Sequence, residues 1–300
     1  MAQTDTAPAP PVKARAAAGR STRSAQQLNE IGLLVAIIVV FAALALTAPG
    51  FLSLNNMTSI LRDAATIGVV AWAATLVIVA GEIDISLGPA VAFASVVMAE
   101  AAGPWGLGIP LAMLVTVGVA TLLGAGAGVL RAFFNVPSFI ATLALFSALR
   151  GLALFTTTAL PVPIDPDPFL DLLAGSILGV PTPAVIMLVL FAVFSFVARR
   201  TAYGRSVYAV GGNAKAAFLA GIPVRRIRVL LFMTTGLMAG LAGILLAARL
   251  GSGNGGAATG LEFDIIAAVV IGGTALTGGR GSMLGTLFGV VFITIIGNGL

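Results

Sequence analysis

The chain has 300 residues, of which 59% are hydrophobic and only 9% are charged, and its mean hydropathy is +1.09. Soluble domains carry about 25% charged residues, so this composition excludes a soluble enzyme or binding module and predicts an integral membrane protein. Because the chain contains no Cys and no His, it lacks the side chains for disulfides, thiol nucleophiles, Cys/His zinc sites and imidazole catalysis, and we expect no catalytic residue, cofactor or metal site.

The N-terminal segment, residues 1–30, consists mainly of Ala, Pro, Ser, Thr and Arg. So few large apolar side chains cannot offset the entropy lost on ordering, which predicts a disordered tail. The apolar run Ile31–Ala48 follows, and Ala43-Leu44-Ala45 within it resembles the cleavage site of a signal peptide. The run exceeds the roughly 7–15 residues of a signal-peptide core, so we expect a retained membrane span.

Apolar segments of about 20 residues then continue to the end of the chain, as a bilayer core of roughly 30 Å requires. The expected spans are Ile31–Ala48, Met57–Ala80, Ser86–Ala102, Gly106–Leu130, Ser138–Thr157, Ala184–Ala198, Val229–Ala248, Asp264–Leu276 and Ser282 to the end. These segments predict an all-α, polytopic membrane protein with about 9–10 transmembrane helices. Nine of them lie within residues 31–300, and one or more further spans are expected beyond Leu300.

The basic residues define the expected orientation. With a cytoplasmic N-terminus, 13 of the 16 Lys and Arg residues fall inside: four in the tail (Lys13, Arg15, Arg20, Arg23), Arg131, seven between Arg199 and Arg228, and Arg280. Cytoplasmic loops are rich in Lys and Arg, so this orientation is favoured. The same placement accounts for the net charge of +5, and no basic stripe interleaves with aromatics, so we expect membrane lipid and no nucleic acid as a partner.

The segment Arg199–Arg228 is far longer than the 2–8 residues of an ordinary helix–helix connection and contains no acidic residue. Asn213 is a candidate N-cap for a short helix over Ala214–Ala220, with Gly221 at its C′ position and Pro223 as its stop. The short helix carries Phe218 and Leu219, with Lys215 as its polar side chain. Two interpretations stay open: insertion into the groove of a cytoplasmic partner, or an interfacial helix lying on lipid headgroups.

Two acidic motifs interrupt the apolar pattern, Glu82-Ile83-Asp84 followed by Ser86, and Glu262-Phe263-Asp264. On the expected topology they lie on opposite sides, as an inverted repeat would place them, and such repeats put substrate near the midplane at broken helices. A carboxylate at the bilayer centre costs about 2.5–3.5 kcal/mol on insertion scales, which suggests a pathway or gating role. The alternative is that both motifs are loop acids in water.

Arg150 lies 13 residues beyond Pro137, about 20 Å along a helix, and therefore toward the outer leaflet. It is a further candidate for the pathway, either snorkelling or paired with Glu100 or Asp171. The GxxxG pairs, such as Gly236/Gly240 and Gly285/Gly289, predict close helix packing within the subunit rather than a dimer interface.

Several long runs resemble one known family. They are GEIDISLGPAVAF, VPSFIATLALFSALRGLAL, GRSVYAVGGNAKAAFLAGIPVRRIR, GLMAGLAGILLAARLGSG and LEFDIIAAVVIGGTALTGGRGSMLGT, in that order. The chain from about Phe51 to Leu300 resembles the permease subunit of ribose-type ABC sugar importers. The resemblance implies a bacterial inner-membrane protein that works as a dimer with two cytoplasmic ATPase subunits and a periplasmic sugar-binding protein. Gly272–Arg280 lacks the GxxxxGK[ST] spacing, so ATP hydrolysis is expected on another chain.

The resemblance also implies site residues. The segment from Gly204 to Pro223 matches the family's ATPase-coupling loop, and the candidate contact residues are Gly204, Arg205, Gly212, Asn213, Ala217, Phe218, Leu219 and Gly221. Ala214 and Lys215 stand where the family often has acidic residues, and Glu82 stands where it commonly has Gly. The expected function is import of a monosaccharide such as ribose or xylose. The alternatives are an ABC permease for nucleosides or branched-chain amino acids, and an ion-coupled secondary transporter.

Overall fold

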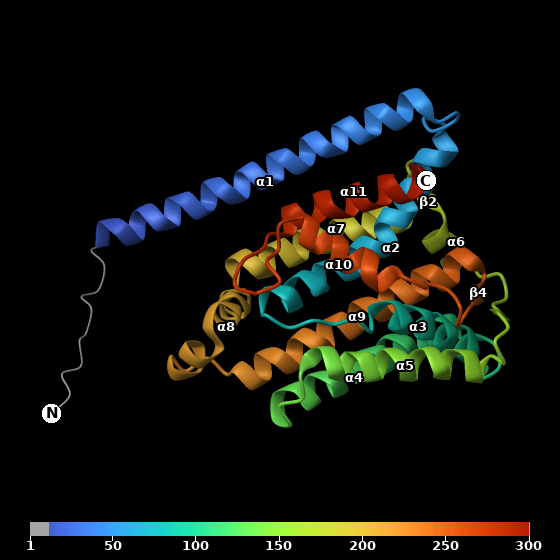
Figure 1. The fold of residues 1–300 in the computed structure, drawn as a ribbon. Helices are drawn as coiled ribbons and strands as arrows, with labels where there is room; N and C mark the ends of the chain where they lie inside the picture. Colours follow the sequence, from blue (N-terminus) through green and yellow to red (C-terminus); the bar gives the residue numbers. More distant parts are fainter. Residues whose placement is uncertain (1–11, 300) are drawn as a thin grey trace.

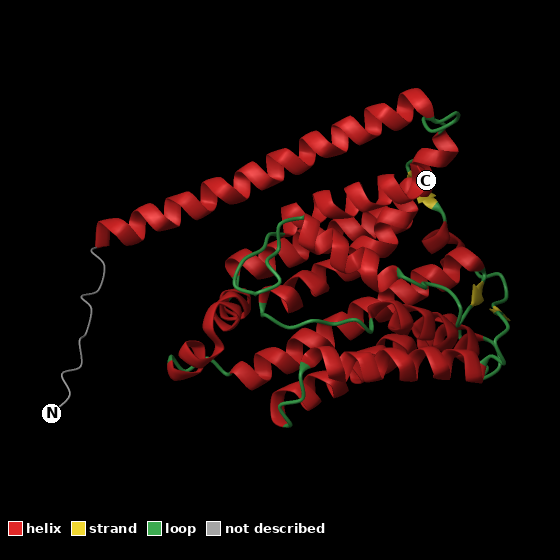
Figure 2. Ribbon diagram, in the orientation of Figure 1, coloured by secondary structure: helices red, strands yellow, loops and turns green. Residues whose placement is uncertain are grey.

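The computed structural model describes residues 12–299 of the chain, and for these it is an all-α bundle with four two-residue strands (Figures 1 and 2). The helices are α1 Val12–Thr47, α2 Leu54–Val79, α3 Leu87–Ala102, α4 Ile109–Phe133, α5 Ser138–Thr156, α6 Pro168–Ala174, α7 Thr182–Arg200, α8 Ala202–Leu219, α9 Val224–Leu250, α10 Leu261–Ile271 and α11 Met283–Gly299. The expected tail, residues 1–30, overlaps α1 from Val12; residues 1–11 lie outside the described part, and the disorder of the tail stays a prediction.

The prediction of a polytopic helical membrane protein is confirmed. Six of the described helical segments are long and apolar enough to cross a membrane: Leu28–Thr47 of α1, and α2, α4, α5, α7 and α9. The shorter apolar helices α3 and α11, together with α10, occupy the other three expected spans. α10 has only 11 residues, and it starts and ends earlier than the expected Asp264–Leu276, so an irregular connection follows it.

Helix α2 is the core of the bundle, because 83% of its most apolar window is buried inside the protein. Helices α7, α8, α9, α10 and α11 all contact it. The fully buried Trp72 donates from Nε1 to the Met187 carbonyl of α7 at 3.2 Å, and its ring lies 5.3 Å from that of Phe191. Because other helices of the chain surround α2 in this way, α2 contacts little lipid.

Glycines bring neighbouring helices into backbone contact. A Cβ on Gly124 of α4 would overlap the Phe232 carbonyl of α9, and one on Gly236 of α9 would overlap the Ala120 carbonyl of α4. In the same way, Gly289 of α11 lies against Ala268 of α10. These glycines pack helices inside the subunit, as predicted, because small residues allow close approach where lipid offers no hydrophobic driving force.

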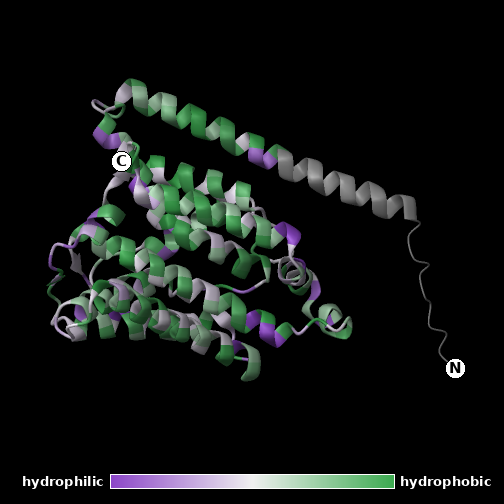
Figure 3. Cartoon of the chain, turned by 180° about the vertical axis from the view of Figure 1, so that it is seen from behind, coloured by the Kyte–Doolittle hydropathy of each residue, from purple (hydrophilic) through white to green (hydrophobic). Residues whose placement is uncertain are grey.

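The two ends of the bundle differ. At one end β1 (Val162–Pro163) pairs antiparallel with β4 (Ser252–Gly253), close to α6 and to the short hairpin of β2 (Ser176–Ile177) and β3 (Val180–Pro181). At the other end lies α8, which we call the α8 end (Figure 1). Seen from behind, the spans are mainly hydrophobic, and a hydrophilic turn marks the start of α9 at the α8 end (Figure 3).

Helix α1 lies at the edge of the bundle, where it contacts α11 (Figure 1). Phe41 and Leu44 of α1 pack with Ile295 of α11 and with Phe51, whose ring centroid is 5.3 Å from that of Phe41. Ser282 donates to Glu30 Oε1 of α1 at 2.7 Å. An apolar seam and this hydrogen bond are among the contacts that hold α1 to the other helices.

Candidate functional site

The segment expected as a long loop, Arg199–Arg228, is mostly helical. α7 continues to Arg200, α8 covers Ala202–Leu219 and α9 begins at Val224. Thr201 starts α8 as its N-cap, with Oγ1 accepting from the Gly204 N–H at 3.1 Å. The helix forms despite three glycines, because Val207 and Val210 are buried in the core cluster.

The predicted short helix is confirmed within the second half of α8. Asn213 leaves the helical conformation (φ −164°, ψ 99°), and its Oδ1 accepts from the Ala216 N–H at 2.9 Å, which is the N-cap geometry. The helix ends at Leu219, and Gly221 has the left-handed φ of +83° expected at C′. Its N–H donates to the Phe218 carbonyl at 3.0 Å. The kink turns residues 214–219 into a separate short helix.

The side chains of this short helix divide into a buried and a free set. Ala217 is buried, whereas Phe218 and Leu219 expose 68% and 78% of their surface. Of the other candidate contact residues, Arg205 is exposed and Gly204 is buried against the Val197 and Ala198 carbonyls of α7. Gly204 thus positions α8, while Phe218 and Leu219 are free to contact another molecule.

Four glycines join α8 to the centre of the bundle, and we call them the glycine junction: Gly81, Gly211, Gly278 and Gly279. A Cβ on Gly211 would overlap the Val79 carbonyl at the end of α2, and one on Gly278 would lie 2.9 Å from both the Gly211 carbonyl and Gly81 N. Gly279 N–H donates to the Val79 carbonyl at 2.7 Å. Gly212 faces open space, because nothing lies within 4 Å of its added Cβ. The junction therefore connects α8, α2 and the α10–α11 connection through backbone atoms.

Glu82 is buried between two arginines. Its carboxylate is only 3% exposed and accepts from Arg131 Nε at the end of α4 at 2.8 and 2.7 Å. Arg228 Nε, in the first turns of α9, lies 2.7 Å from Oε1 but its N–H is not aligned for a hydrogen bond. Sequence reasoning missed both arginines as site residues. The cluster ties the α2–α3 connection to α4 and α9, and its burial contradicts the alternative of a loop acid in water.

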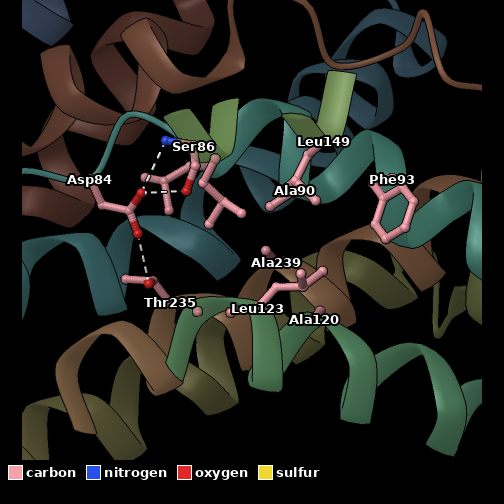
Figure 4. Close-up of a pocket in the computed structure, with 13 residues that line it drawn as sticks. Asp84, Ser86, Ala90, Phe93, Ala120, Leu123, Leu149, Thr235 and Ala239 are labelled. Carbon is pink, nitrogen blue, oxygen red and sulfur yellow. Dashed lines mark hydrogen bonds between the residues drawn. The ribbon is translucent and has the colours of Figure 1, made fainter. Parts of the chain in front are cut away.

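Asp84 lies at the polar end of a small cavity (Figure 4). Oδ1 accepts from Ser86 N and Oγ at 3.0 and 2.6 Å, and Oδ2 accepts from Thr235 Oγ1 of α9 at 2.8 Å. The cavity has a volume of about 10 Å³, room for one water molecule, and its other walls are largely apolar surfaces of α3, α4, α5 and α9. Asp84 and Ser86 thus hold α9 against the start of α3.

The second acidic motif is split by the structure. Glu262 is buried against Gly88 in the first turn of α3, and its Oε2 has no hydrogen-bond partner among the described residues. Asp264 is exposed. Glu262 therefore lies against the start of α3, the helix that begins just after Asp84. Asp264 lies on the exposed surface, away from the start of α3.

The expected partners of Arg150 are wrong. Its Nη1 donates to the Gly255 and Ala257 carbonyls at 2.8 and 3.0 Å, rather than to a carboxylate of Glu100 or Asp171. Arg150 thereby fixes the α9–α10 connection to α5. Within the described residues, no group of three His, Cys, Asp or Glu side chains could hold a metal ion.

Comparison with known proteins identifies the family. Residues 56–300 match the model described as branched-chain amino acid transport system / permease component. The chain is 61% identical to the probable ABC transporter permease protein YphD of Escherichia coli K12 over 275 residues, which is 92% of this chain and 82% of YphD. It is 39% identical to the L-arabinose ABC transporter permease protein AraH of Azospirillum brasilense (89% and 79% covered) and 38% identical to the ribose import permease protein RbsC of E. coli K12 (94% and 89% covered).

No solved structure matches the chain. The family match covers most of the chain, and the relatives agree with it in being named as permease proteins. The chain therefore belongs to the family of ABC transporter permeases described as branched-chain amino acid transport system / permease component.

Proposed function

We propose that the chain forms the translocation pathway of an ATP-driven importer for a monosaccharide, such as ribose or xylose, delivered by a periplasmic binding protein. Support comes from the relatives named for ribose and L-arabinose, because the chain matches more than three quarters of the length of each. The family description names branched-chain amino acids, which makes these the second substrate class to test, ahead of nucleosides. The proposed assembly contains a second permease subunit, two cytoplasmic ATPase subunits and the binding protein.

The short helix of α8 is the proposed contact with the ATPase. It carries two large apolar side chains, Phe218 and Leu219, that the permease itself leaves exposed. An exposed apolar pair on a short helix suits insertion into a groove of a partner, and this favours docking over the interfacial alternative. The glycine junction then passes movement of α8 directly to the end of α2, because backbone contacts have no flexible side chain between them.

The buried acidic segment is the proposed gate. Glu82 joins the ends of α4 and α9 at the α8 end, and Asp84 holds α9 two helical turns further on, through Thr235. The cavity beside Asp84 admits one water and no sugar, which supports a closed conformation of the pathway. Opening would separate α9 from the α2–α3 connection, so Glu82, Asp84 and Ser86 are the proposed gating residues. Glu262 and Arg150 are proposed to hold the surrounding connections, and Asp264, which is exposed, to line the entrance.

The double variant Phe218→Asp/Gly221→Val tests the docking proposal. Aspartate removes the apolar contact, and valine at a φ of +83° disrupts the end of the short helix. Co-expressed with its cognate ATPase, the variant should insert into the membrane normally but lose co-purification of the ATPase. The matched control is Phe169→Asp/Gly179→Val, which makes the same two changes at the opposite end, where Gly179 has a φ of +84°.

Uptake by proteoliposomes that contain the complete importer tests the transport proposal with the docking variant. Wild type should accumulate labelled ribose or xylose only when ATP is present, and the docking variant should not. The control variant is compared for co-purification of the ATPase alone, because its end of the bundle faces the proposed binding protein. Normal co-purification of the docking variant would overturn the role of the short helix. Accumulation of leucine in place of any monosaccharide would favour the amino-acid alternative, and accumulation without ATP would favour a secondary transporter.

A further inference from the structure

A groove of about 730 Å³ opens at the α8 end, between the end of α4, the short helix of α8 and the start of α9. Its lining combines two exposed aromatic rings with four cationic side chains. These residues are Phe133, Lys215, Phe218, Arg225, Arg226 and Arg228. The groove thus combines apolar and strongly positive surface.

Among the residues that the structure describes, three of the groove's four cations have no acidic partner, and Arg228 alone is paired, with Glu82. The three ion pairs of the described residues involve Arg131, Arg228 and Arg249, and none includes Lys215, Arg225 or Arg226. The first turn of α9 contains arginines and no acidic residue. Cations near a helix N-terminus oppose the helix dipole, so an anion in the groove would relieve two unfavourable interactions at once.

The groove also borders an exposed apolar face of the bundle. Leu122, Val129, Leu130 and Phe133 are exposed on one face of α4, at helical spacing, and this face leads from the middle of the span to the groove. The Arg225 guanidinium lies 5.6 Å from the centre of the Phe133 ring, at the point where the apolar face meets the cations. A molecule that fits both parts has a negatively charged head and an apolar tail.

We propose that the groove binds one anionic phospholipid, with its headgroup phosphate beside Lys215, Arg225 and Arg226 and its acyl chains along α4. Basic pockets between membrane helices are known to take anionic headgroups. An acidic segment of another protein would satisfy the charges but would not use the exposed face of α4, so the lipid is favoured. The inference depends on the chain lying in a membrane and is independent of the proposed sugar, but the groove shares Lys215 and Phe218 with the proposed ATPase contact, so lipid binding is measured on the permease without the ATPase.

The test is lipid binding by the purified full-length chain, measured by native mass spectrometry during titration with phosphatidylglycerol or phosphatidylcholine. Wild type should bind one phosphatidylglycerol in preference to phosphatidylcholine. The groove variant K215Q/R225Q/R226Q should bind phosphatidylglycerol at least about tenfold more weakly, since each of its cations attracts the phosphate. The control R199Q/R200Q/R280Q removes three exposed cations that do not line the groove and should stay close to wild type.

The proposal is overturned if the wild type shows no preference for phosphatidylglycerol, or if the groove and control variants lose the same amount of phosphatidylglycerol affinity. It is also overturned if a groove variant binds the lipid as the wild type does but no longer assembles with the ATPase. The last result would assign the groove to a protein contact. If the triple variant aggregates, K215Q and R226Q are measured singly, because both side chains are exposed, and each should weaken binding of phosphatidylglycerol by roughly threefold.

Discussion

At the scale of single residues, Glu82 brings together two arginines from different helices in a buried position. Three charges meet there, and each belongs to a different element: the α2–α3 connection, α4 and α9. A buried ion pair gives little net stability compared with apolar packing, but removal of one partner leaves the other charges without compensation. Glu82 therefore matters most for holding one arrangement of these elements.

We expect Glu82→Gln to lower the free energy of unfolding by about 1–3 kcal/mol, below the 3–5 kcal/mol of a fully buried pair, because Arg131 and Arg228 keep 21% and 16% of their side-chain surface exposed. Thermal unfolding in detergent would show a fall in Tm of several degrees. The matched control is Asp63→Asn, which breaks the pair with Arg249 at 2.7 Å, where both side chains are more than a third exposed. That change should cost less than about 1 kcal/mol, and equal losses would contradict the special position of Glu82.

The sequence identified Glu82, Asp84 and Ser86 as unusual because polar residues interrupt an apolar run. It could not identify their partners, since Arg131 and Thr235 lie 49 and 151 residues from the acids that they contact. Arg150 shows the same limit more sharply. Its partners are backbone carbonyls of a connection 105 and 107 residues away, and a carbonyl has no side chain by which a sequence could mark it.

At the scale of elements, α8 connects an exposed surface to the core through the glycine junction. We expect Gly211→Ala to displace α8, because the added methyl group meets the backbone of Val79 and Gly279, which cannot rotate away. A misfit of this kind typically costs about 1–3 kcal/mol. Limited proteolysis of α8 and the Tm of the purified chain would both report the change.

The neighbouring Gly212→Ala is the control, because its added methyl group meets nothing within 4 Å. Since alanine favours a helix over glycine by up to about 1 kcal/mol, this change should be neutral or slightly stabilising. Destabilisation by Gly211→Ala together with slight stabilisation by Gly212→Ala would support the role of the glycine junction. Equal effects would show that helix propensity, and not the backbone contact, controls the position of α8.

The caps of the short helix were predictable, because Asn213, Gly221 and Pro223 act through their own backbone and immediate neighbours. The first half of α8 was not, since its glycines and polar residues hide the apolar pattern and its burial depends on distant elements. Conversely, the expected span Asp264–Leu276 is longer than α10, because apolar composition continues past the residue where the helix stops, at Gly272.

At the scale of the molecule, the expected cytoplasmic N-terminus rests on charge distribution. The absence of Cys makes the orientation simple to test, because a single introduced cysteine is the only reactive thiol. Lys215→Cys should react with a membrane-impermeant maleimide in inside-out vesicles and remain unlabelled in intact spheroplasts. Asp165→Cys, an exposed position near β1 at the opposite end, should show the reverse pattern. Labelling of Lys215→Cys in spheroplasts would invert the topology.

The all-α membrane fold and the order of its helices could be predicted from the apolar segments, because lipid forces each segment into a helix of suitable length. Composition says nothing of which helix lies at the centre. α2 and α5 have similar hydropathy, 1.6 and 1.8, yet 83% and 22% of their windows are buried. The inverted repeat stays a prediction.

The enclosed position of α2 limits how this permease can move. Because α2 touches five other helices, any large displacement of α2 would break contacts on all its sides at once. We therefore expect a transport cycle to move the surrounding helices relative to α2, while α8 acts on the end of α2 through the glycine junction without displacing the whole helix. A solute would pass beside α2, between helices that can separate. The residues that control its passage are therefore expected where α2 and the helices around it face each other.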